Sequence, residues 1–381
     1  MTLLEIFTLF LSIHWSIVSF YVILGWSSFL LYKVKQSGKR ATHVELVIVS
    51  KASGSVRHSL FQSIQYHLTH LSCDMPINVI IDDGSDLEIK ISKFAKETMD
   101  CRLIIVPDEF ECKAIAKGRA IEYFIQNYVD KDKWYAFIDD DNKLMTDDFL
   151  YEVPYYEKKG YTCANGILKP RIGQSKITYI ADHLRWLDDL SIFRFGTGFL
   201  GSAINGIHGE LLLCKGSALK EVTFNRETIT EDFAFARELI KKGHKFWQSK
   251  TVISILSPHN LIDFIKQRNR WYKGLAKDIP SADWKTLFFA GIRIFLWKLS
   301  IFGSPLLFFL WPFVDLPIAV LLFCLLGTLH YYIAYLIGII NLEEKWSKKW
   351  PFIFLIPFYS ILEAIGPHYQ SKQSGFIVIE K

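Results

Sequence analysis

The stretch Trp134-Tyr-Ala-Phe-Ile-Asp-Asp-Asp141 decides the fold. Its first five residues form a short, uninterrupted apolar run, which is typical of a strand buried on both faces of a parallel sheet. Three carboxylates follow at the point where such a strand would end. Ligands of parallel sheets bind beyond the carboxyl ends of the strands. This stretch therefore predicts a sheet and also the edge where its ligand binds.

The same pattern occurs upstream, where short apolar runs alternate with segments of helical spacing. The runs lie at 45–49, 77–81 and 103–106, and the helical segments at 59–71 and 113–127. Strands that alternate with helices predict an α/β domain with a mostly parallel sheet and helices on both faces. The run at 77–81 also ends in carboxylates, in Asp82-Asp83-Gly84-Ser85. Both acidic clusters are therefore expected at one edge of the sheet.

The two clusters suit different ligands. Side chains at i and i+2 of a strand point the same way, so Asp139 and Asp141 are expected to share one ligand while Asp140 points elsewhere. Oxygen ligands favour a divalent cation such as Mg²⁺ or Mn²⁺, although a solvated acidic loop is the alternative. Asp82 and Asp83 could accept hydrogen bonds from a nucleobase or ribose, although an ordinary turn also uses Asp, Gly and Ser.

A third cluster, Thr228-Ile-Thr-Glu-Asp232, precedes a segment of helical spacing that ends at Lys242-Gly243. Thr228 and Glu231 have the spacing of a capping box, and Gly243 is the expected C-terminal cap. Capping does not require Asp232. A carboxylate in the first helical turn has a fixed direction and an ionised form favoured by the helix dipole, so Asp232 is a candidate general base.

A fourth cluster, Gln267-Arg-Asn-Arg-Trp271, places Gln267, Arg270 and Trp271 on one face of a helix. Arginine binds phosphate oxygens, and an indole offers a stacking surface to a sugar ring. These residues predict a sugar-phosphate site. An aromatic and basic belt at a membrane surface is the alternative.

The N-terminal segment Leu3–Tyr32 carries no charge except Glu5 and is long enough to cross a bilayer. It lacks the basic start and short apolar core of a signal peptide, so residues 1–33 are expected to form an uncleaved anchor. Four basic residues follow it, at Lys33, Lys35, Lys39 and Arg40. The positive-inside bias predicts an integral membrane protein with its N-terminus outside and the domain at 41–280 in the cytosol.

The C-terminal third predicts further membrane segments. Their expected ranges are 283–298 for an interfacial helix, 299–341 for a transmembrane hairpin turning at 315–317, 351–366 for an interfacial or membrane helix, and 367–381 for a cytosolic tail. His330 lies in the middle of the hairpin and is expected to be a neutral histidine bonded within it, although an intramembrane ionisable group can mark a functional site.

Composition limits the partners. The formal net charge is only +5, without one dominant basic tract, so nucleic acid is not expected as a partner. A mildly basic balance suits an anionic membrane surface. The six cysteines form no C-x-x-C pair and have no zinc spacing, which indicates reduced thiols in a cytosolic domain. Association of the chain with itself is left open.

Together and in this order, the four clusters resemble the D-D-G-S, D-x-D, T-E-D and Q-x-x-R-W motifs of family-2 glycosyltransferases of GT-A fold. The last two look like those of the membrane-embedded branch of cellulose, chitin and hyaluronan synthases. A closer likeness, to the egghead-type β-mannosyltransferases, rests on Lys113-Ala114, on 181–189, on 222–225 and on Asp263–Gly274. The tail 375–381 is similar to the cellulose synthase gating loop.

The resemblance implies a role for each site residue. Donor binding would fall to Asp82, Asp83, Lys113, Asp139, Asp140, Gln267 and Arg270; metal binding to Asp139 and Asp141; acceptor binding to Glu231 and Trp271; and proton abstraction to Asp232. His208, in Asn205–Glu210, is expected to make only a structural hydrogen bond.

The expected activity is an inverting, metal-dependent transfer of a sugar from a nucleotide-sugar (a UDP-sugar or GDP-mannose) to a membrane-associated acceptor, lipid-linked or glycan. A processive polysaccharide synthase that secretes its product is the main alternative, but three or four membrane segments make a polymer channel hard to enclose. A catalytically inactive membrane scaffold or receptor would not need carboxylates at three separated sites.

Overall fold

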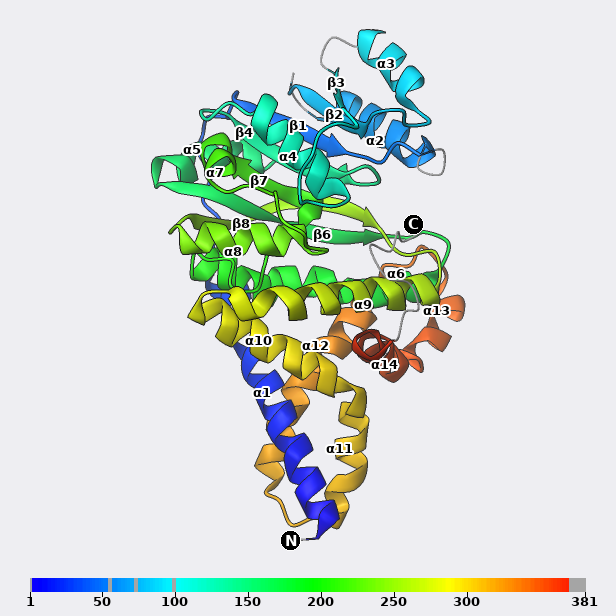
Figure 1. Cartoon of the computed structure of the whole chain (residues 1–381). Helices are drawn as coiled ribbons and strands as arrows, with labels where there is room; N and C mark the ends of the chain where they lie inside the picture. Colours follow the sequence, from blue (N-terminus) through cyan, green and yellow to red (C-terminus); the bar gives the residue numbers. More distant parts are fainter. Residues whose placement is uncertain (1, 54–56, 72–74, 98–100, 370–381) are drawn as a thin grey trace.

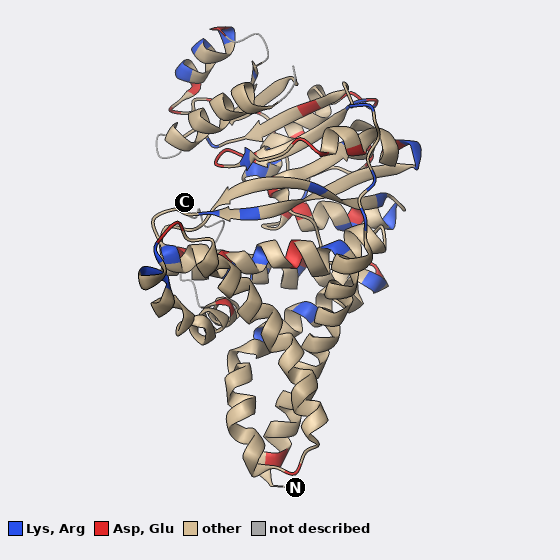
Figure 2. Ribbon diagram, turned by 180° about the vertical axis from the view of Figure 1, so that it is seen from behind, with Lys and Arg blue, Asp and Glu red and all other residues tan. Residues whose placement is uncertain are grey.

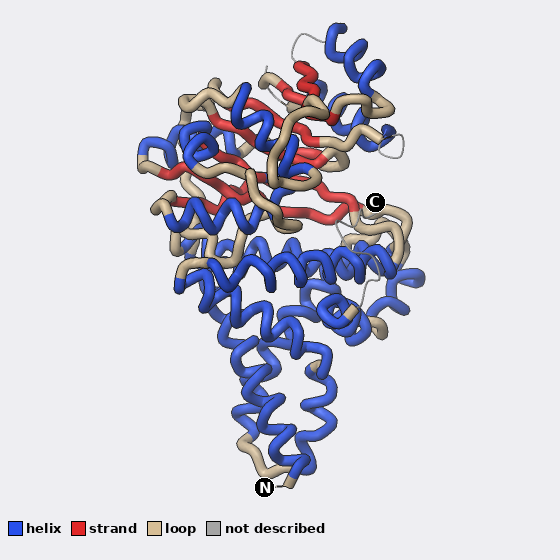
Figure 3. The backbone as a smooth tube through the Cα atoms, in the orientation of Figure 1, coloured by secondary structure: helices blue, strands red, loops and turns tan. Residues whose placement is uncertain are grey.

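The computed structural model describes residues 2–53, 57–71, 75–97 and 101–369. A sheet domain forms one end of the molecule and a narrow helical stalk, which contains the N-terminus, forms the other (Figure 1). Between them lies a layer of helices that includes α6 (Lys176–Asp188) and α9 (Leu261–Asp278). The division between strands and helices is plain in the backbone tube (Figure 3).

The sheet has eight strands in the order β3-β2-β1-β4-β7-β6-β8-β5. In chain order they are β1 (Val44–Val49), β2 (Ile77–Asp82), β3 (Cys101–Val106), β4 (Trp134–Asp139), β5 (Lys143–Leu144), β6 (Tyr161–Arg171), β7 (Leu212–Lys215) and β8 (Lys245–Leu256). The first four pair in parallel, which confirms the four strands and the parallel arrangement expected from the apolar runs. Strand β7 then joins β4 in the antiparallel sense.

Alternate residues of the parallel strands pack against two separate layers of helices. On β4, Trp134, Ala136 and Ile138 face a core that includes α2 (Arg57–His70), α3 (Glu88–Glu97) and α5 (Phe149–Lys158). Tyr135 and Phe137 face the opposite core, with α4 (Lys117–Asn127), α7 (Gly216–Glu221) and α8 (Glu231–Lys241). Burial on both faces explains why the strands have uninterrupted apolar sequences.

The stalk contains α1 (Leu3–Leu31), α11 (Ser304–Leu310) and α12 (Ile318–Ile340), and it is almost free of charged residues (Figures 1 and 2). Among the described residues, α1 and α12 are long and apolar enough to cross a membrane, and two bent helix pairs raise the number to as many as four. A Cβ at Gly327 of α12 would lie 2.9 Å from Val18 Cγ1, so glycine permits the close approach of α12 to α1.

The segments between 283 and 368 differ from the expected hairpin. In its first arm, a short 3₁₀ helix (Ser300–Phe302) continues α10 (Trp284–Leu299). Helix α11 follows across a 56° bend at Gly303 and ends in a second 3₁₀ helix (Trp311–Phe313). The bent pair of α10 and α11 together has the length and composition of a membrane-crossing segment. The second arm is α12, as expected.

Other helix boundaries also differ from those expected from the sequence. The single helix expected over 351–366 is instead two short helices, α13 (Trp346–Ile353) and α14 (Ile356–Ile365), which are bent by 56° relative to each other. Helix α4 begins at Lys117 and not at Lys113. The gating-loop-like stretch at 375–381 lies outside the described residues, and Asn269 Nδ2 binds the Gly366 and Tyr369 carbonyls just before the described chain ends.

Candidate active site

The first two acidic clusters lie at the same edge of the sheet, on either side of β1. Asp82 ends β2 and Asp139 ends β4, and both strands pair in parallel with β1. Arg119 Nη1 donates to Asp82 Oδ1 at 2.8 Å, so Asp82 is already held by a cation. Asp83 is exposed, and its Oδ1 accepts from the amide of Gly84, whose φ of +65° forms the turn.

The three carboxylates after β4 have separate environments. The strand ends at Asp139 and the chain turns, with Asn142 N donating to the Asp139 carbonyl, so strand alternation does not set the directions of Asp140 and Asp141. That step of the sequence argument is wrong. Ser50 Oγ donates to Asp140 Oδ2 at 2.5 Å. Asp141 is only 6% exposed, and Arg171 Nη2 donates to its carbonyl.

A lysine links the second acidic cluster to the third. Lys117 Nζ lies 3.1 Å from Asp139 Oδ1 and 3.2 Å from Glu231 Oε1. Burial alone would lower the pKa of Lys117, but the carboxylates of Asp139, Glu231 and Asp232 reverse that effect and hold it well above its ordinary value. Lys117 is therefore charged at neutral pH.

Asp232 lies next to this lysine at the start of α8. The amides of Gly209 and Phe233 donate to its two carboxylate oxygens at 2.9 and 2.8 Å. Burial and the neighbouring Glu231 carboxylate raise the pKa of Asp232 to about 6, against the opposing charge of Lys117. The carboxylate is oriented, and its pKa lies close to neutrality, as a general base requires.

The capping box expected from Thr228 and Glu231 is wrong. Helix α8 begins one residue after Thr230, which makes no side-chain capping bond. The hydroxyls of Thr228 and Thr230 instead donate to Asp278 Oδ2 at 2.6 and 2.9 Å. These bonds tie the segment before the candidate base to the end of α9. The predicted C-cap is confirmed, since Gly243 has a φ of +79°.

Helix α9 brings only part of the predicted fourth cluster to the adjoining cavity. Gln267 is buried, and its Oε1 accepts from Arg268 Nη1 at 2.6 Å. The α9 residues that line the adjoining cavity are Arg268, Trp271 and Leu275, whereas Gln267 and Arg270 do not line it.

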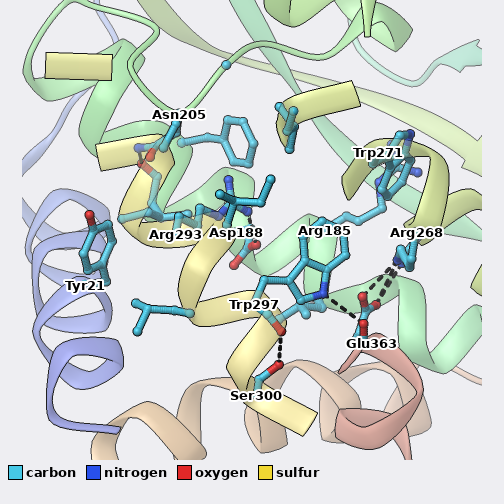
Figure 4. Close-up of a pocket in the computed structure, with 18 of the residues that line it drawn as sticks. Tyr21, Arg185, Asp188, Asn205, Arg268, Trp271, Arg293, Trp297, Ser300 and Glu363 are labelled. Atoms are coloured by element: carbon cyan, nitrogen blue, oxygen red, sulfur yellow. Dashed lines mark hydrogen bonds and ion pairs between the residues drawn. The ribbon is translucent and has the colours of Figure 1, made fainter. Parts of the chain in front are cut away.

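Arg268 was absent from the sequence prediction, yet it is among the largest fully buried side chains. Its Nη2 lies 2.7 Å from Asp182 Oδ1 in α6. The same atom lies 2.9 Å from Glu363 Oε1 in α14 (Figure 4). The guanidinium groups of Arg268 and Arg185 each lie 4.7 Å from the ring of Trp271, and Arg185 is itself ion-paired with Glu210. Trp271 is therefore oriented by two paired cations.

A cavity of about 260 Å³ connects this region with the stalk. Its lining includes Asp232, Glu210 and Trp271 and also Trp15 and Tyr21 of α1. Asp188, Arg293 and Trp297 lie along its wall (Figure 4). The candidate base and the candidate acceptor platform thus share one cavity that extends to the apolar helices.

Two histidines border this cavity. His330 is bonded as expected, but its partners are not in the hairpin: Trp26 Nε1 of α1 donates to Nδ1, and Nε2 lies 3.1 Å from Asp188 Oδ1. An indole can only donate, so Nε2 carries the proton of the neutral ring. His208 makes the expected structural bond, with Asp189 Oδ1 at 2.6 Å, and this partner raises its pKa despite burial.

Lys113 was the lysine predicted for the donor site, whereas Lys117 is the lysine that contacts Asp139 and Glu231. Lys113 is exposed, and its backbone amide donates to Asn225 Oδ1 at 2.6 Å. Only the repetition of lysine in Lys113-Ala-Ile-Ala-Lys117 could have pointed to the second position. Glu210, Arg185, Asp188 and Arg293 were also missed. Arg185 and Asp188 lie in the stretch 181–189 that carries the family resemblance, and Glu210 ends Asn205–Glu210, but nothing in these stretches points to a role in the site.

No group of three or more His, Cys, Asp or Glu side chains among the described residues is arranged to hold a metal by itself. Asp139 ends β4, and Asp141 lies in the turn that follows it. Magnesium in nucleotide sites is commonly held by one or two carboxylates together with substrate phosphates. Two carboxylates so close together in the chain are a donor set that fits Mg²⁺ or Mn²⁺ shared with a diphosphate.

A sheet of this topology, with carboxylates beyond β2 and β4 and a third acidic cluster on a following helix, defines a transferase of GT-A type. The model of glycosyl transferase family group 2 matches residues 134–339, more than half of the chain, and the protein belongs to that family. The predicted family and fold class are confirmed.

Among curated proteins, the chain is similar to the β-1,4-mannosyltransferase egh of Drosophila melanogaster, at 25% identity over 244 residues, which is 58% of this chain and 50% of that protein. It is also similar to the β-1,4-mannosyltransferase bre-3 of Caenorhabditis elegans, at 24% identity over 255 residues, which is 63% of this chain and 56% of that protein. The chain thus spans about half the length of the curated relatives it matches.

Among solved structures, a mannosyltransferase of Pyrobaculum calidifontis in complex with GDP-Man and Mn²⁺ superimposes with a TM-score of 0.60 at 14% identity. The match covers 96% of this chain and 99% of the other. At this level of identity the likeness establishes the fold.

Proposed function

We propose that the protein is an inverting hexosyltransferase that moves a sugar from a nucleotide-sugar to a lipid-linked acceptor at the membrane surface. The single observation that carries this proposal is the cavity shared by Asp232, Trp271 and the stalk. A carboxylate base beside an aromatic platform suits a sugar acceptor, and the stalk end suits a lipid chain. The likeness to egh and bre-3 supports mannose as the transferred sugar.

In this proposal Asp82, Asp83 and Lys113 hold the nucleoside, and Asp139, Asp140, Gln267 and Arg270 hold the diphosphate. A Mg²⁺ or Mn²⁺ ion on Asp139 and Asp141 would neutralise the leaving group. Asp232 takes the proton of the acceptor hydroxyl as that oxygen attacks the anomeric carbon, and the bond to the diphosphate breaks. Glu231 and Trp271 orient the acceptor.

The basic residues after α1 support an orientation with the sheet domain in the cytosol and the N-terminus outside. The described residues contain between two and four candidate spans. This number favours a single transfer over processive synthesis with secretion, because few helices enclose a polymer channel poorly.

The proposal is tested with protein purified in detergent and incubated with GDP-mannose and a panel of UDP-sugars, each with Mn²⁺, Mg²⁺ or EDTA. Release of the nucleoside diphosphate from one donor, lost in EDTA, is the expected result. Addition of a membrane lipid extract should give a product one sugar heavier by mass spectrometry. A ladder of products would favour the processive alternative, and no release from any donor would contradict the proposal.

The pH dependence follows from the raised pKa of Asp232. The base must be ionised to accept a proton, so kcat is expected to fall as the pH drops through about 6 and to be maintained above it. The measurement is kcat at saturating donor and acceptor over the range from about pH 5 to pH 8. A rate that stays constant through pH 6 would remove Asp232 from this role.

A further inference from the structure

The strongest unassigned feature is the position of Lys117 between two motifs that are far apart in the sequence. Its ammonium contacts Asp139 at the end of β4 and Glu231 at the start of α8, at 3.1 and 3.2 Å. No other lysine or arginine of the described residues forms an ion pair with either carboxylate. Lys117 thus links Asp139, which is proposed to bind the donor, to Glu231, which is proposed to bind the acceptor.

The backbone before Lys117 is strained. Ala116 has a φ of +49°, a region that residues with a Cβ rarely adopt. Lys117 then occupies the first position of α4, where the helix dipole disfavours a positive charge. Two local preferences therefore oppose this arrangement, and strain of this kind persists where the surrounding structure compensates for it. The carboxylates around Nζ provide that compensation.

Gly209 provides the space for the ammonium. A Cβ at this position would lie 2.5 Å from Lys117 Nζ and 3.5 Å from Asp232 Oδ2. The amide of the same glycine donates to Asp232 Oδ2 at 2.9 Å. Lys117 and the candidate base are therefore neighbours across one residue that has no side chain.

We propose that Lys117 is a positioning residue that holds β4 and α8 in one acidic cluster and competes with the divalent cation for Asp139. The inference rests on the proposed function and deepens it. Without this charge, Asp139, Glu231 and Asp232 would repel one another, and the start of α8, which carries Glu231 and Asp232, would lose its link to the end of β4. The same loss would leave Asp139 more attractive to a cation.

The first test is Lys117→Met, which removes the charge and keeps a chain of similar length. Turnover is expected to fall on the order of 10²-fold, with little change in the KM for the donor. In the absence of donor, Mn²⁺ is expected to bind roughly tenfold more tightly, because a competing positive charge is gone. Binding is measured by electron paramagnetic resonance of free Mn²⁺ during titration. A residue that only supported the fold would not strengthen metal binding while weakening turnover.

The second test is Gly209→Ala, which keeps every charge but displaces the ammonium, and turnover is expected to fall in the same way. Gly291→Ala is the matched control, because its Cβ would meet nothing closer than Ile279 Cγ2 at 3.7 Å and Gly291 does not line the cavity. That control should retain wild-type turnover and Mn²⁺ affinity.

Failure of this inference is distinguishable from failure of the proposed function. If the wild-type protein releases no nucleoside diphosphate from any donor, the proposed function fails. The Mn²⁺ titration then still tests whether Lys117 competes with the cation for Asp139. The inference would be overturned if the wild type and Lys117→Met bind Mn²⁺ with equal affinity. It would also be overturned if neither protein binds Mn²⁺. Wild-type turnover in Lys117→Met would overturn it as well.

Discussion

Asp232→Asn is expected to lower the rate of sugar transfer on the order of 10³-fold and to leave donor binding nearly unchanged. The substitution keeps the size of the side chain and one acceptor oxygen. It removes the ability to take up a proton, which is the step assigned to this carboxylate. Transfer is measured by mass spectrometry of the product, and donor binding by calorimetry with the nucleoside diphosphate and Mn²⁺.

The control for this prediction is Glu221→Gln, an acid-to-amide change at a side chain that is 48% exposed and does not line the cavity. It should retain wild-type transfer. Full transfer activity in Asp232→Asn would refute the assignment of the base. Loss of donor binding together with transfer would instead place Asp232 in the donor site.

Arg268→Met is expected to destabilise the protein by about 3–5 kcal/mol, because it leaves two buried carboxylates without their cation. Arg268 is 1% exposed, and the side chains of Asp182 and Glu363 are 0% and 10% exposed. The three residues belong to α9, α6 and α14, so their separation would loosen the layer beneath the cavity. The measurement is the shift of the apparent melting temperature in detergent, with the yield of folded protein.

Two companion variants sharpen this test. Arg226→Met breaks a pair with Glu238 in which the arginine side chain is 38% exposed, and it should cost less than about 1 kcal/mol. The double variant Arg268→Met/Glu363→Gln should recover part of the lost stability, since one buried charge is removed with its partner. Equal melting temperatures for Arg268→Met and Arg226→Met would show that the buried pairs contribute little.

The elements of the sheet were predictable because burial of a parallel strand requires a continuous apolar run, and such a run is visible in the chain. The residues Trp134 to Ile138 and their counterparts upstream meet that requirement locally. The failures occurred where the cause lies outside the segment. Thr228 and Glu231 have the spacing of a capping box, but the hydroxyl of Thr228 donates a hydrogen bond to Asp278 at the end of α9 instead.

The apolar runs of the C-terminal third were also recognised, although their ends were not. Hydropathy identifies the apolar residues of a segment. Whether the helix bends within that segment depends on how neighbouring helices pack against it. Gly303, at the break between α10 and α11, has a φ of +56° that the composition of the segment does not reveal.

The sequence by itself determined the fold class, the family and the acidic clusters, since each depends on residues close together in the chain: apolar runs, the turns that follow them and short motifs. Only the tertiary structure decided which charged side chains form ion pairs with one another. Lys117 reaches Asp139 and Glu231, and Arg268 reaches Asp182 and Glu363, because strands and helices distant in sequence pack side by side. Ion pairs of this kind arise from burial in three dimensions, where a charge needs a partner that local spacing does not specify.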